Sequence, residues 1–316
     1  MSEGARLEDI GFYTLTDVRA ATASPFSPLM RCELLVTDAC NFRCTYCRSS
    51  HDGGHLAWED ARAVLDLWIE DDIRNVRFSG GEPTLWPHLV AAVAHMPSGC
   101  RVAISTNGSA SQVVYDRLLA AGVTDFSISM DACCSSTAEK MADRSGVWER
   151  IVENIEYLSA RTYVTVGIVV TDEKRQEVAA TISLADSLGV SDIRVIPAAQ
   201  YGATVEVDAP TLEGHPILKY RMGNLASGRP FRGIAPTDAH RCSLVFDDMA
   251  VQDGKHYPCI IYLREGGDPI GEVGERMRTE RAVWSATHDT HADPICKGNC
   301  LDVCIDYNNR CRDLAR

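Results

Sequence analysis

The sequence lacks an apolar run long enough to cross a membrane, and residues 1–9 are too polar for a signal peptide. It also lacks an excess of basic residues, because 31 Lys and Arg stand against 44 Asp and Glu, a formal net charge of −13. A surface that follows nucleic-acid phosphates or anionic lipid headgroups needs the opposite sign. Together these absences favour a cytoplasmic protein with neither a nucleic acid nor a membrane as its partner.

Cysteine, by contrast, is abundant, with 13 in 316 residues. Without a secretion signal, this number favours metal binding over a disulfide framework. Cys40, Cys44 and Cys47 follow a short apolar run at 34–36 with the spacing C-x3-C-x2-C. A 4Fe–4S cluster needs four ligands, so three thiolates leave one iron open. An open position distinguishes a reactive metal site from a closed structural one.

Apolar runs alternate with amphipathic stretches from residue 31 to about residue 200, a pattern that predicts a parallel sheet covered by helices. Strands are expected at 34–36, 76–78, 102–104, 126–130, 163–170 and 193–196, and helices at 58–70, 89–93, 113–121, 147–158 and 177–188. Six such units are fewer than the eight of a closed barrel, so we predict an α/β fold with a partial, TIM-like (βα)6 barrel over 31–200. Residues 1–30 are expected as a lead-in, 201–241 as a linker and 242–316 as a small Cys-rich domain.

Polar residues follow the predicted strands at the edge where a barrel places its chemistry. The Gly-Gly-Glu-Pro sequence at 80–83 follows the second strand, where the glycines allow a close backbone approach and the glutamate offers an acceptor for an ammonium group. The polar candidates at these strand ends are Gly80, Gly81, Glu82, Ser105, Asn107, Ser129 and Asp131.

The three-cysteine sequence, with Tyr46 just before its last cysteine, and the Gly-Gly-Glu-Pro turn resemble the radical S-adenosylmethionine (SAM) superfamily. The resemblance implies that Cys40, Cys44 and Cys47 hold a 4Fe–4S cluster whose open iron is chelated by SAM. It also implies one-electron cleavage of SAM to a 5′-deoxyadenosyl radical, which abstracts hydrogen from the substrate. The electron would come from a reducing donor such as flavodoxin or ferredoxin.

The same resemblance suggests roles for the polar residues at the strand ends. The turn at 80–83 would bind the SAM amino group, while Ser129 and Arg144 would hold its carboxylate. Asn107 and Asp131 would lie near the ribose or the substrate, and 193–197 would border the adenine. The implied cofactor-binding residues are Tyr46, Gly80, Gly81, Glu82, Ser105, Asn107, Ser129 and Arg144.

A second cysteine-rich pattern lies near the C-terminus. Cys242 and Cys259 form C-x11-G-x4-C with Gly254, which resembles the SPASM and twitch subfamilies, where a β-hairpin bears this pair. The downstream cysteines are Cys296, Cys300, Cys304 and Cys311. Their spacing, C-x3-C-x3-C-x6-C, departs from the C-x2-C-x5-C-x3-C usual in SPASM domains. We expect one auxiliary iron–sulfur cluster, with Cys242 and Cys259 as its surest ligands, and a structural zinc site as the alternative.

Two further cysteines, Cys133 and Cys134, follow Asp131 on the face where a substrate should bind. The three are the candidate catalytic residues. A thiol there can return a hydrogen atom to a substrate radical, as a cysteine does in peptide epimerases of the superfamily. Loop thiols without a function are the alternative interpretation.

The sequence therefore predicts a radical SAM enzyme that oxidises, dehydrogenates or cross-links a peptide or a small natural product. Epimerisation by Cys133 or Cys134 is the alternative reaction, and a zinc-binding or redox-sensing regulator is the alternative of another class. Residues 1–30 are too few for a leader-recognition domain, so the substrate is expected to be a small metabolite or a peptide presented by a separate leader-binding protein.

Overall fold

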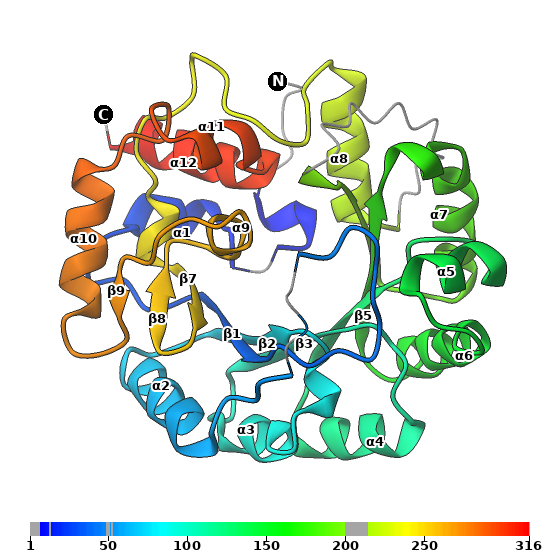
Figure 1. Cartoon of the computed structure of the whole chain (residues 1–316). Helices are drawn as coiled ribbons and strands as arrows, with labels where there is room; N and C mark the ends of the chain where they lie inside the picture. Colours follow the sequence, from blue (N-terminus) through cyan, green and yellow to red (C-terminus); the bar gives the residue numbers. More distant parts are fainter. Residues whose placement is uncertain (1–6, 13, 49–50, 52, 200–213, 316) are drawn as a thin grey trace.

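The computed structural model describes the chain apart from residues 1–6, 13, 49–50, 52, 200–213 and 316 (Figure 1). Within this described part, the strands form one nine-stranded sheet in the order β6-β5-β4-β3-β2-β1-β7-β8-β9. Strands β1 to β6 pair in parallel in chain order. They do not close into a ring, so the predicted partial barrel is confirmed. The strands are β1 (Arg31–Thr37), β2 (Asn75–Gly80), β3 (Arg101–Thr106), β4 (Asp125–Ser129), β5 (Tyr163–Val170), β6 (Asp192–Pro197), β7 (Asp248–Gln252), β8 (Lys255–Tyr257) and β9 (Gly271–Glu272).

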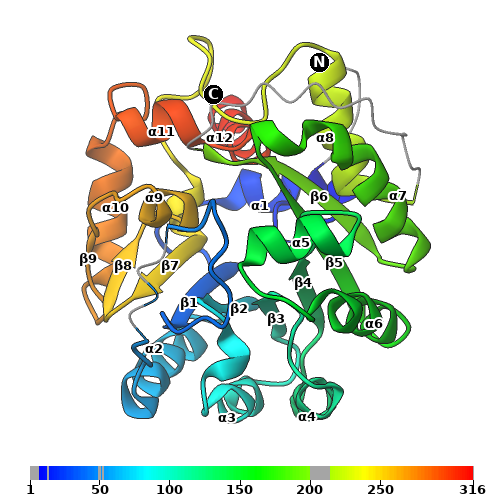
Figure 2. The same ribbon diagram turned by 45° about the vertical axis from the view of Figure 1, so that its right-hand side comes forward.

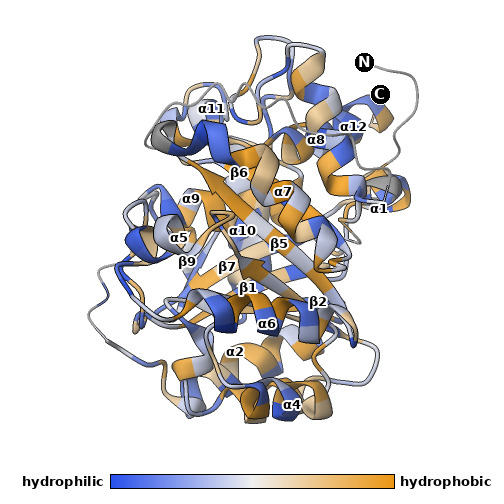
Figure 3. Ribbon diagram, turned by 90° about the vertical axis from the view of Figure 1, so that its right-hand side faces the viewer, coloured by the Kyte–Doolittle hydropathy of each residue, from blue (hydrophilic) through white to orange (hydrophobic). Residues whose placement is uncertain are grey.

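Helices lie along the outer face of the sheet, and Figure 2 shows α2, α3, α4 and α6 side by side there. Strand residues such as Val76 and Phe78 alternate onto this face and join one apolar core with helix residues such as Trp68. Figure 3 shows the same division, with strongly apolar strands and helices of mixed polarity around them. The helices are α1 (Asp17–Thr22), α2 (Trp58–Glu70), α3 (Leu89–His95), α4 (Gln112–Ala121), α5 (Ser135–Ala142), α6 (Trp148–Ser159), α7 (Val178–Ser187), α8 (Pro216–Ala226), α9 (Ile260–Arg264), α10 (Met277–Thr287), α11 (Pro294–Asn299) and α12 (Asp302–Leu314).

Three segments differ from the sequence-based expectation. Residues 132–145, expected as a loop, contain α5, which is short and buries only Met141 and Ala142. Part of the expected linker, 201–241, forms α8, where Arg221 is fully buried and donates to the carbonyl of Val195 in β6. The C-terminal region, expected to show little helical periodicity, contains α10, α11 and α12.

The residue types on the buried face of α12 explain why the sequence does not predict this helix. Its buried face includes the polar Asp302 and Asn308 and only two aliphatic residues, Val303 and Ile305, so the apolar period is weak in the sequence. The buried residues of this helix are Asp302, Val303, Cys304, Ile305, Tyr307, Asn308 and Cys311.

The C-terminal region is joined to the barrel through the sheet. Strand β7 pairs in parallel with β1, and β8 and β9 follow it in antiparallel order. The division of the chain into a barrel and a separate Cys-rich domain therefore stays a prediction.

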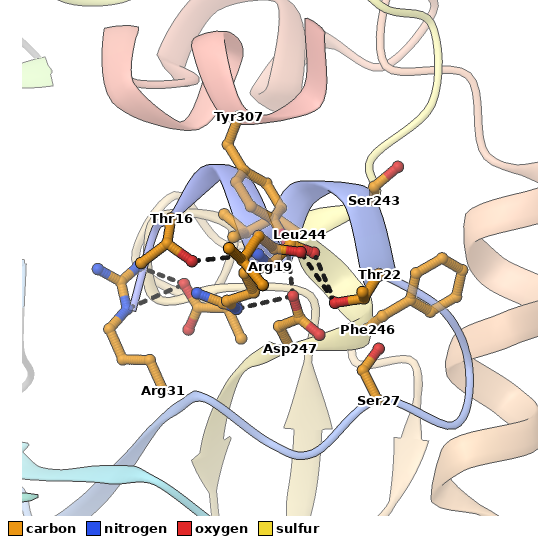
Figure 4. Close-up of polar contacts among 12 residues, drawn as sticks. Thr16, Arg19, Thr22, Ser27, Arg31, Ser243, Leu244, Phe246, Asp247 and Tyr307 are labelled. Carbon is orange, nitrogen blue, oxygen red and sulfur yellow. Dashed lines mark hydrogen bonds and ion pairs between the residues drawn. The ribbon is translucent and has the colours of Figure 1, made fainter. Parts of the chain in front are cut away.

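A buried ion pair connects the N-terminal segment to this region (Figure 4). Arg19 of α1 lies 2.8 Å, Nε to Oδ2, from Asp247, which directly precedes β7. Tyr307 of α12 donates its hydroxyl to the same carboxylate at 2.5 Å. The backbone N–H groups of Met30 and Arg31 donate to the carbonyl of Asp247. These contacts hold α1, the start of β1, β7 and α12 together.

No described helix is both long and apolar enough to cross a membrane.

Candidate metal centre

The loop that carries Cys40, Cys44 and Cys47 leaves β1 at its C-terminal end. Thr37 fixes the exit, because its hydroxyl donates to the carbonyl of Gly54 at 2.8 Å and accepts from the N–H of Ala39 at 3.0 Å. The loop backbone is bonded to the end of α5 through Arg43 N–H to Ala142 O and Thr45 N–H to Met141 O. Cys40 and Cys44 are half-buried and Cys47 is exposed. The thiols are thus held on a braced loop with one side open.

The surroundings of Cys40 and Cys44 disfavour the ionised form of both thiols and raise the pKa of each. Burial, followed by the Asp131 carboxylate and the Cys47 thiol, raises the pKa of Cys44 to about 12. Burial is also the main cause of the raised pKa of Cys40. Thiols in this position stay protonated without a cation, whereas a bound metal deprotonates its ligands outright. The site therefore suits a multiply charged metal centre.

The sulfur spacing favours a cluster over a single zinc ion. Zn–S bonds of 2.3 Å in a tetrahedron place thiolates about 3.8 Å apart. Within the described part of the chain, no three cysteine sulfurs lie within 4.8 Å of one another. The cysteines of the loop and of the C-terminal region therefore do not form a zinc site by themselves, although Cys296 lies with His288 and Asp293 in a group whose ligand atoms are within 4.8 Å of one another.

Gly80 and Gly81 allow the end of β2 to approach this loop. A Cβ on Gly80, where φ is +131°, would lie 2.2 Å from the carbonyl oxygen of Thr37, and one on Gly81 would lie 2.3 Å from that of Ala39. The close approach is used for two hydrogen bonds, Gly81 N–H to Thr37 O and Glu82 N–H to Ala39 O. The glycines were predicted to approach a ligand. In the structure they approach the backbone that carries the cysteines.

The Glu82 side chain is fully buried and ties the ends of β2 and β3 together. Its Oε1 accepts from the N–H and hydroxyl of Thr84 and from the hydroxyl of Thr106, and its Oε2 accepts from the N–H of Asn107. Burial raises the pKa of Glu82, and these hydrogen bonds lower it. The Glu82 carboxylate stabilises the turn through these hydrogen bonds. Its predicted contact with the SAM amino group stays a prediction.

Asn107 links the third strand end to the cysteine loop. Its amide donates to Asn41 Oδ1 at 2.8 Å and lies 4.0 Å from the sulfur of Cys40. Ser105 instead accepts from Arg77 at 2.9 Å across the inner face of the sheet, and so belongs to the barrel interior.

Ser129 and Arg144 are both exposed, Ser129 as the last residue of β4. Within the described part of the chain the Arg144 side chain has no hydrogen-bond or ion-pair partner. Their predicted contact with a carboxylate therefore stays a prediction.

Tyr46 and Asp131 brace the cysteine loop against the sheet. The tyrosine hydroxyl donates to Asp131 Oδ2 at 2.5 Å, and Asp131 Oδ1 accepts from the N–H of Val169 in β5 at 2.7 Å. Burial is the main cause of the raised pKa of both side chains. Tyr46 thus orients the loop that ends in Cys47.

Cys133 and Cys134 lie next to Glu177, with the two sulfurs and a carboxylate oxygen within 4.8 Å of one another. The Cys134 thiol bonds to the Thr137 hydroxyl at 3.3 Å, and that hydroxyl donates to Glu177 Oε1 at 3.2 Å. Hydrogen bonding with Thr137 and Ser136 lowers the pKa of Cys134, whereas burial raises that of Cys133. Cys134 is therefore the more reactive thiol of the pair.

Five of the six C-terminal cysteines converge on one cavity, which Tyr262, Trp284 and Asn308 also line. The expected hairpin is present, because Cys242 precedes β7, Cys259 follows β8 and Gly254 lies between the two strands. Cys311 does not line the cavity and lies beside Ser243 and Tyr307. The cysteines that line it are Cys242, Cys259, Cys296, Cys300 and Cys304.

The thiols of this cavity also require a cation. Burial, with smaller contributions from Asp248 and Cys242, raises the pKa of Cys259 to about 12, and burial together with the neighbouring thiols raises the pKa of Cys300 well above its usual value. A cavity lined by five such thiols has enough donors for one four-iron cluster.

One charged residue of this region was missed from the sequence. Lys174 lies shortly after β5 and is buried near Asp131 and Glu177. The rule that polar residues after a strand line the site, applied to the first four strands, extends to the fifth and would have found it.

Residues 34–185 match the family model described as the radical SAM superfamily. These residues form a radical SAM domain. The match contains the three-cysteine loop, the Gly-Gly-Glu-Pro turn and the ends of the first five strands. A radical SAM domain implies a 4Fe–4S cluster and SAM, and the many cysteines of the C-terminal region are compatible with a further iron–sulfur cluster.

Curated relatives include a probable GTP 3′,8-cyclase of Saccharolobus islandicus, 31% identical over 176 residues, 54% of this chain and 57% of the relative. Molybdenum cofactor biosynthesis protein 1 of Drosophila melanogaster is 31% identical over 130 residues, 38% of this chain and 23% of the relative. The chain thus spans little more than half of the length of the cyclase and less of the second relative.

Among solved structures, SuiB of Streptococcus suis bound to S-adenosylmethionine has a TM-score of 0.60 at 12% identity, covering 85% of this chain and 67% of SuiB. Native anSMEcpe with bound AdoMet has a TM-score of 0.58 at 14% identity, covering 91% of this chain and 97% of anSMEcpe. At these identities the similarity shows the fold.

Proposed function

We propose that this radical SAM enzyme abstracts hydrogen from a peptide or a small natural product, with oxidation, dehydrogenation or cross-linking as the net result. The observation that carries the proposal is the open, braced loop of Cys40, Cys44 and Cys47 packed against the Gly-Gly turn at 80–81. Bound there, the cluster and SAM would supply a one-electron cleavage that generates a hydrogen-abstracting radical. The protein supplies position and exclusion of water.

Different residues of the chain would bind SAM and position the cysteine loop. The turn at 80–83 would offer backbone carbonyls to the SAM amino group, since the Glu82 carboxylate already accepts four hydrogen bonds. Ser129 and Arg144 are exposed and able to turn toward a carboxylate. Tyr46 and Asp131 would keep the cysteine loop in place through their mutual hydrogen bond.

The five-cysteine cavity would hold one auxiliary 4Fe–4S cluster, with Cys242 and Cys259 among its ligands. Such a cluster can accept an electron from a substrate radical, which makes the net reaction an oxidation, or it can relay the first electron. Cluster potentials span roughly −700 to +450 mV, so either role is chemically open.

Two of the solved neighbours favour a peptide as the substrate. SuiB has been crystallised bound to its precursor peptide SuiA, and anSMEcpe with the Cp18Cys peptide. By extension, this enzyme would take its electron from a donor such as flavodoxin or ferredoxin and would accept a peptide presented by a separate leader-binding protein. The need for reduced thiols favours the cytoplasm.

A specific observation supports epimerisation as the second candidate. Cys134 is partly exposed, has a lowered pKa and lies on the loop that follows β4. A thiol in that position can donate a hydrogen atom to a substrate radical. The neighbouring Thr137 and Glu177 would hold it in place.

The test is product analysis after anaerobic reconstitution with iron and sulfide. The enzyme receives SAM, a strong reductant and a precursor peptide in D2O, with GTP in a parallel reaction because the curated relatives are probable GTP 3′,8-cyclases. Loss of two hydrogens without deuterium gain supports oxidation, and deuterium at carbon without mass loss supports epimerisation. Conversion of GTP alone would contradict the peptide proposal.

A further inference from the structure

Three metal-ligating side chains of different chemistry meet at the connection between α10 and α11. His288 is the C-cap residue of α10, Asp293 is the N-cap residue of α11, and Cys296 lies in the first turn of α11. One ligand atom from each of the three lies within 4.8 Å of the others. Only 18% of the His288 side chain and 12% of the Asp293 side chain are exposed, so these donors face the protein interior.

The thiol and the carboxylate both face the same nitrogen of the histidine ring. His288 Nε2 lies 3.8 Å from the Cys296 sulfur and 3.4 Å from Asp293 Oδ2. In a nucleophilic triad the two ring nitrogens have separate partners, the nucleophile on one and the carboxylate on the other. Here both partners surround Nε2, an arrangement in which a single ion can contact all three donors. The geometry therefore favours a metal ion over a triad.

The separations of these atoms match those of a tetrahedral zinc site. Bonds of about 2.3 Å to sulfur and about 2.0–2.2 Å to nitrogen and oxygen place the sulfur about 3.6 Å from the nitrogen, and the nitrogen about 3.4 Å from the oxygen. The observed separations are 3.8 Å and 3.4 Å. Zinc accepts imidazole, carboxylate and thiolate ligands, and the two negative charges of this set would neutralise the ion.

Further contacts hold the donors in place. The His288 ring stacks on Trp284, with the ring centroids 4.0 Å apart. Asp293 Oδ1 accepts from the N–H of Cys296 at 2.9 Å, and Asp293 Oδ2 accepts from the Tyr262 hydroxyl at 2.9 Å. Contacts of this kind orient the ligands of metal sites. The three donors are therefore preorganised by the protein itself.

The number of thiols in the neighbouring cavity leaves Cys296 available for a second metal. Five cysteines line this cavity, whereas a 4Fe–4S cluster takes four. The sulfurs of Cys242 and Cys259 accept from the Asn308 amide and from the N–H of Tyr262, and hydrogen bonds to sulfur are typical of cluster ligands. Among the cavity cysteines that the structure describes, Cys296 alone lies in a group with a histidine and a carboxylate.

We propose that His288, Asp293 and Cys296 bind one zinc ion beside the five-cysteine cavity, with a water molecule as the fourth ligand. The ion would join the end of α10 to the start of α11. The remaining cavity cysteines would then be the four ligands of the auxiliary cluster: Cys242, Cys259, Cys300 and Cys304. This division of the cysteines rests on the proposed function, whereas the zinc site rests on its three donors alone.

The test uses the full chain after anaerobic reconstitution with iron and sulfide, followed by an excess of zinc sulfate and gel filtration. Iron and zinc are counted per chain, and X-ray absorption at the zinc K-edge gives the ligands of the bound zinc. Wild type should keep about one zinc, with one sulfur at about 2.3 Å and lighter ligands at about 2.0–2.2 Å. His288→Ala should lose the zinc and keep its iron. His240→Ala, which changes an exposed histidine bonded to Asp289 in the same connection, is the control and should keep both.

Two further variants separate the zinc site from the cluster. Asp293→Asn keeps an acceptor for the N–H of Cys296, so α11 stays capped, and it should weaken zinc binding about tenfold or more. Cys296→Ser should lose the zinc and keep the iron with its visible absorption. Loss of about four iron atoms from Cys296→Ser would make this thiol a cluster ligand and overturn the inference, as would a wild type whose zinc is absent or bound by sulfur alone. A wild type that binds zinc in this way but never cleaves SAM would refute only the proposed function.

Discussion

At the scale of single residues, the thiols of the radical SAM loop are positioned by atoms that never touch iron. Gly80 and Gly81 leave room for the backbone of the loop, and the buried Glu82 carboxylate holds the turn in place through its hydrogen bonds. A buried carboxylate with four donors is fully satisfied, so its loss leaves unpaired donors in the interior.

Gly81→Ala should displace the cysteine loop, because its Cβ would lie 2.3 Å from the carbonyl oxygen of Ala39. We expect loss of the iron bound by this loop and of SAM cleavage, measured by iron content and 5′-deoxyadenosine formation. Gly54→Ala is the matched control, since a Cβ there meets nothing within 4 Å. Equal iron content in the two variants would refute this role for Gly81.

Cys134 should be the first thiol alkylated in the cluster-loaded protein. Its lowered pKa means that it ionises at a lower pH than an ordinary cysteine, so its rate with iodoacetamide rises and levels off earlier as the pH increases. Peptide mass mapping across a pH series measures this. Thr137→Val removes a hydrogen bond to the sulfur and should shift the profile to higher pH. Faster labelling of Cys133 than of Cys134 would count against the assignment.

At the scale of elements, the strand–helix alternation and the strand-end motifs were predictable from sequence, because each has a local pattern. The pairing of β7 with β1 was not, since contacts between residues 31–34 and 248–251 leave no local trace. Helix α12 was missed because its buried face combines Cys, Asp, Tyr and Asn with only two aliphatic residues, Val303 and Ile305. Lys174 was missed because a lone lysine reads as a surface residue unless its burial is known.

The cavity geometry predicts unequal roles for the C-terminal cysteines. The double variant of Cys242→Ser and Cys259→Ser leaves three thiols along the cavity, fewer than a four-iron cluster needs, whereas Cys311→Ser changes a thiol that lies outside the cavity. After reconstitution, we expect the first variant to lose about four iron atoms per chain and the second to lose none. Iron and sulfide analysis with visible absorption measures both. Iron loss in Cys311→Ser would contradict the assignment.

The buried pair of Arg19 and Asp247 should contribute to stability, because it joins α1 to β7 and α12 (Figure 4). Arg19→Met leaves the Asp247 charge buried with the Tyr307 and Ser27 hydroxyls but no cation beside it. Breaking such a pair costs about 3–5 kcal/mol, measured by denaturant unfolding. The double variant with Asp247→Asn should recover part of this loss. No recovery would mean that the effect comes from packing rather than from charge.

At the scale of the whole molecule, one sheet connects two cysteine-rich sites. The radical SAM loop follows β1, and the β7–β8 hairpin that flanks the second cavity pairs with β1 as well. The sheet therefore fixes the position of one site relative to the other, as an electron path between two clusters requires.

The most direct test of the account is 5′-deoxyadenosine formation from SAM by anaerobically reconstituted protein under a strong reductant. Wild type should bind about eight iron atoms and cleave SAM. The variant with Cys40, Cys44 and Cys47 all changed to alanine should keep about four iron atoms and form no 5′-deoxyadenosine. Near-stoichiometric zinc in place of iron, with no cleavage of SAM by wild type, would contradict the account.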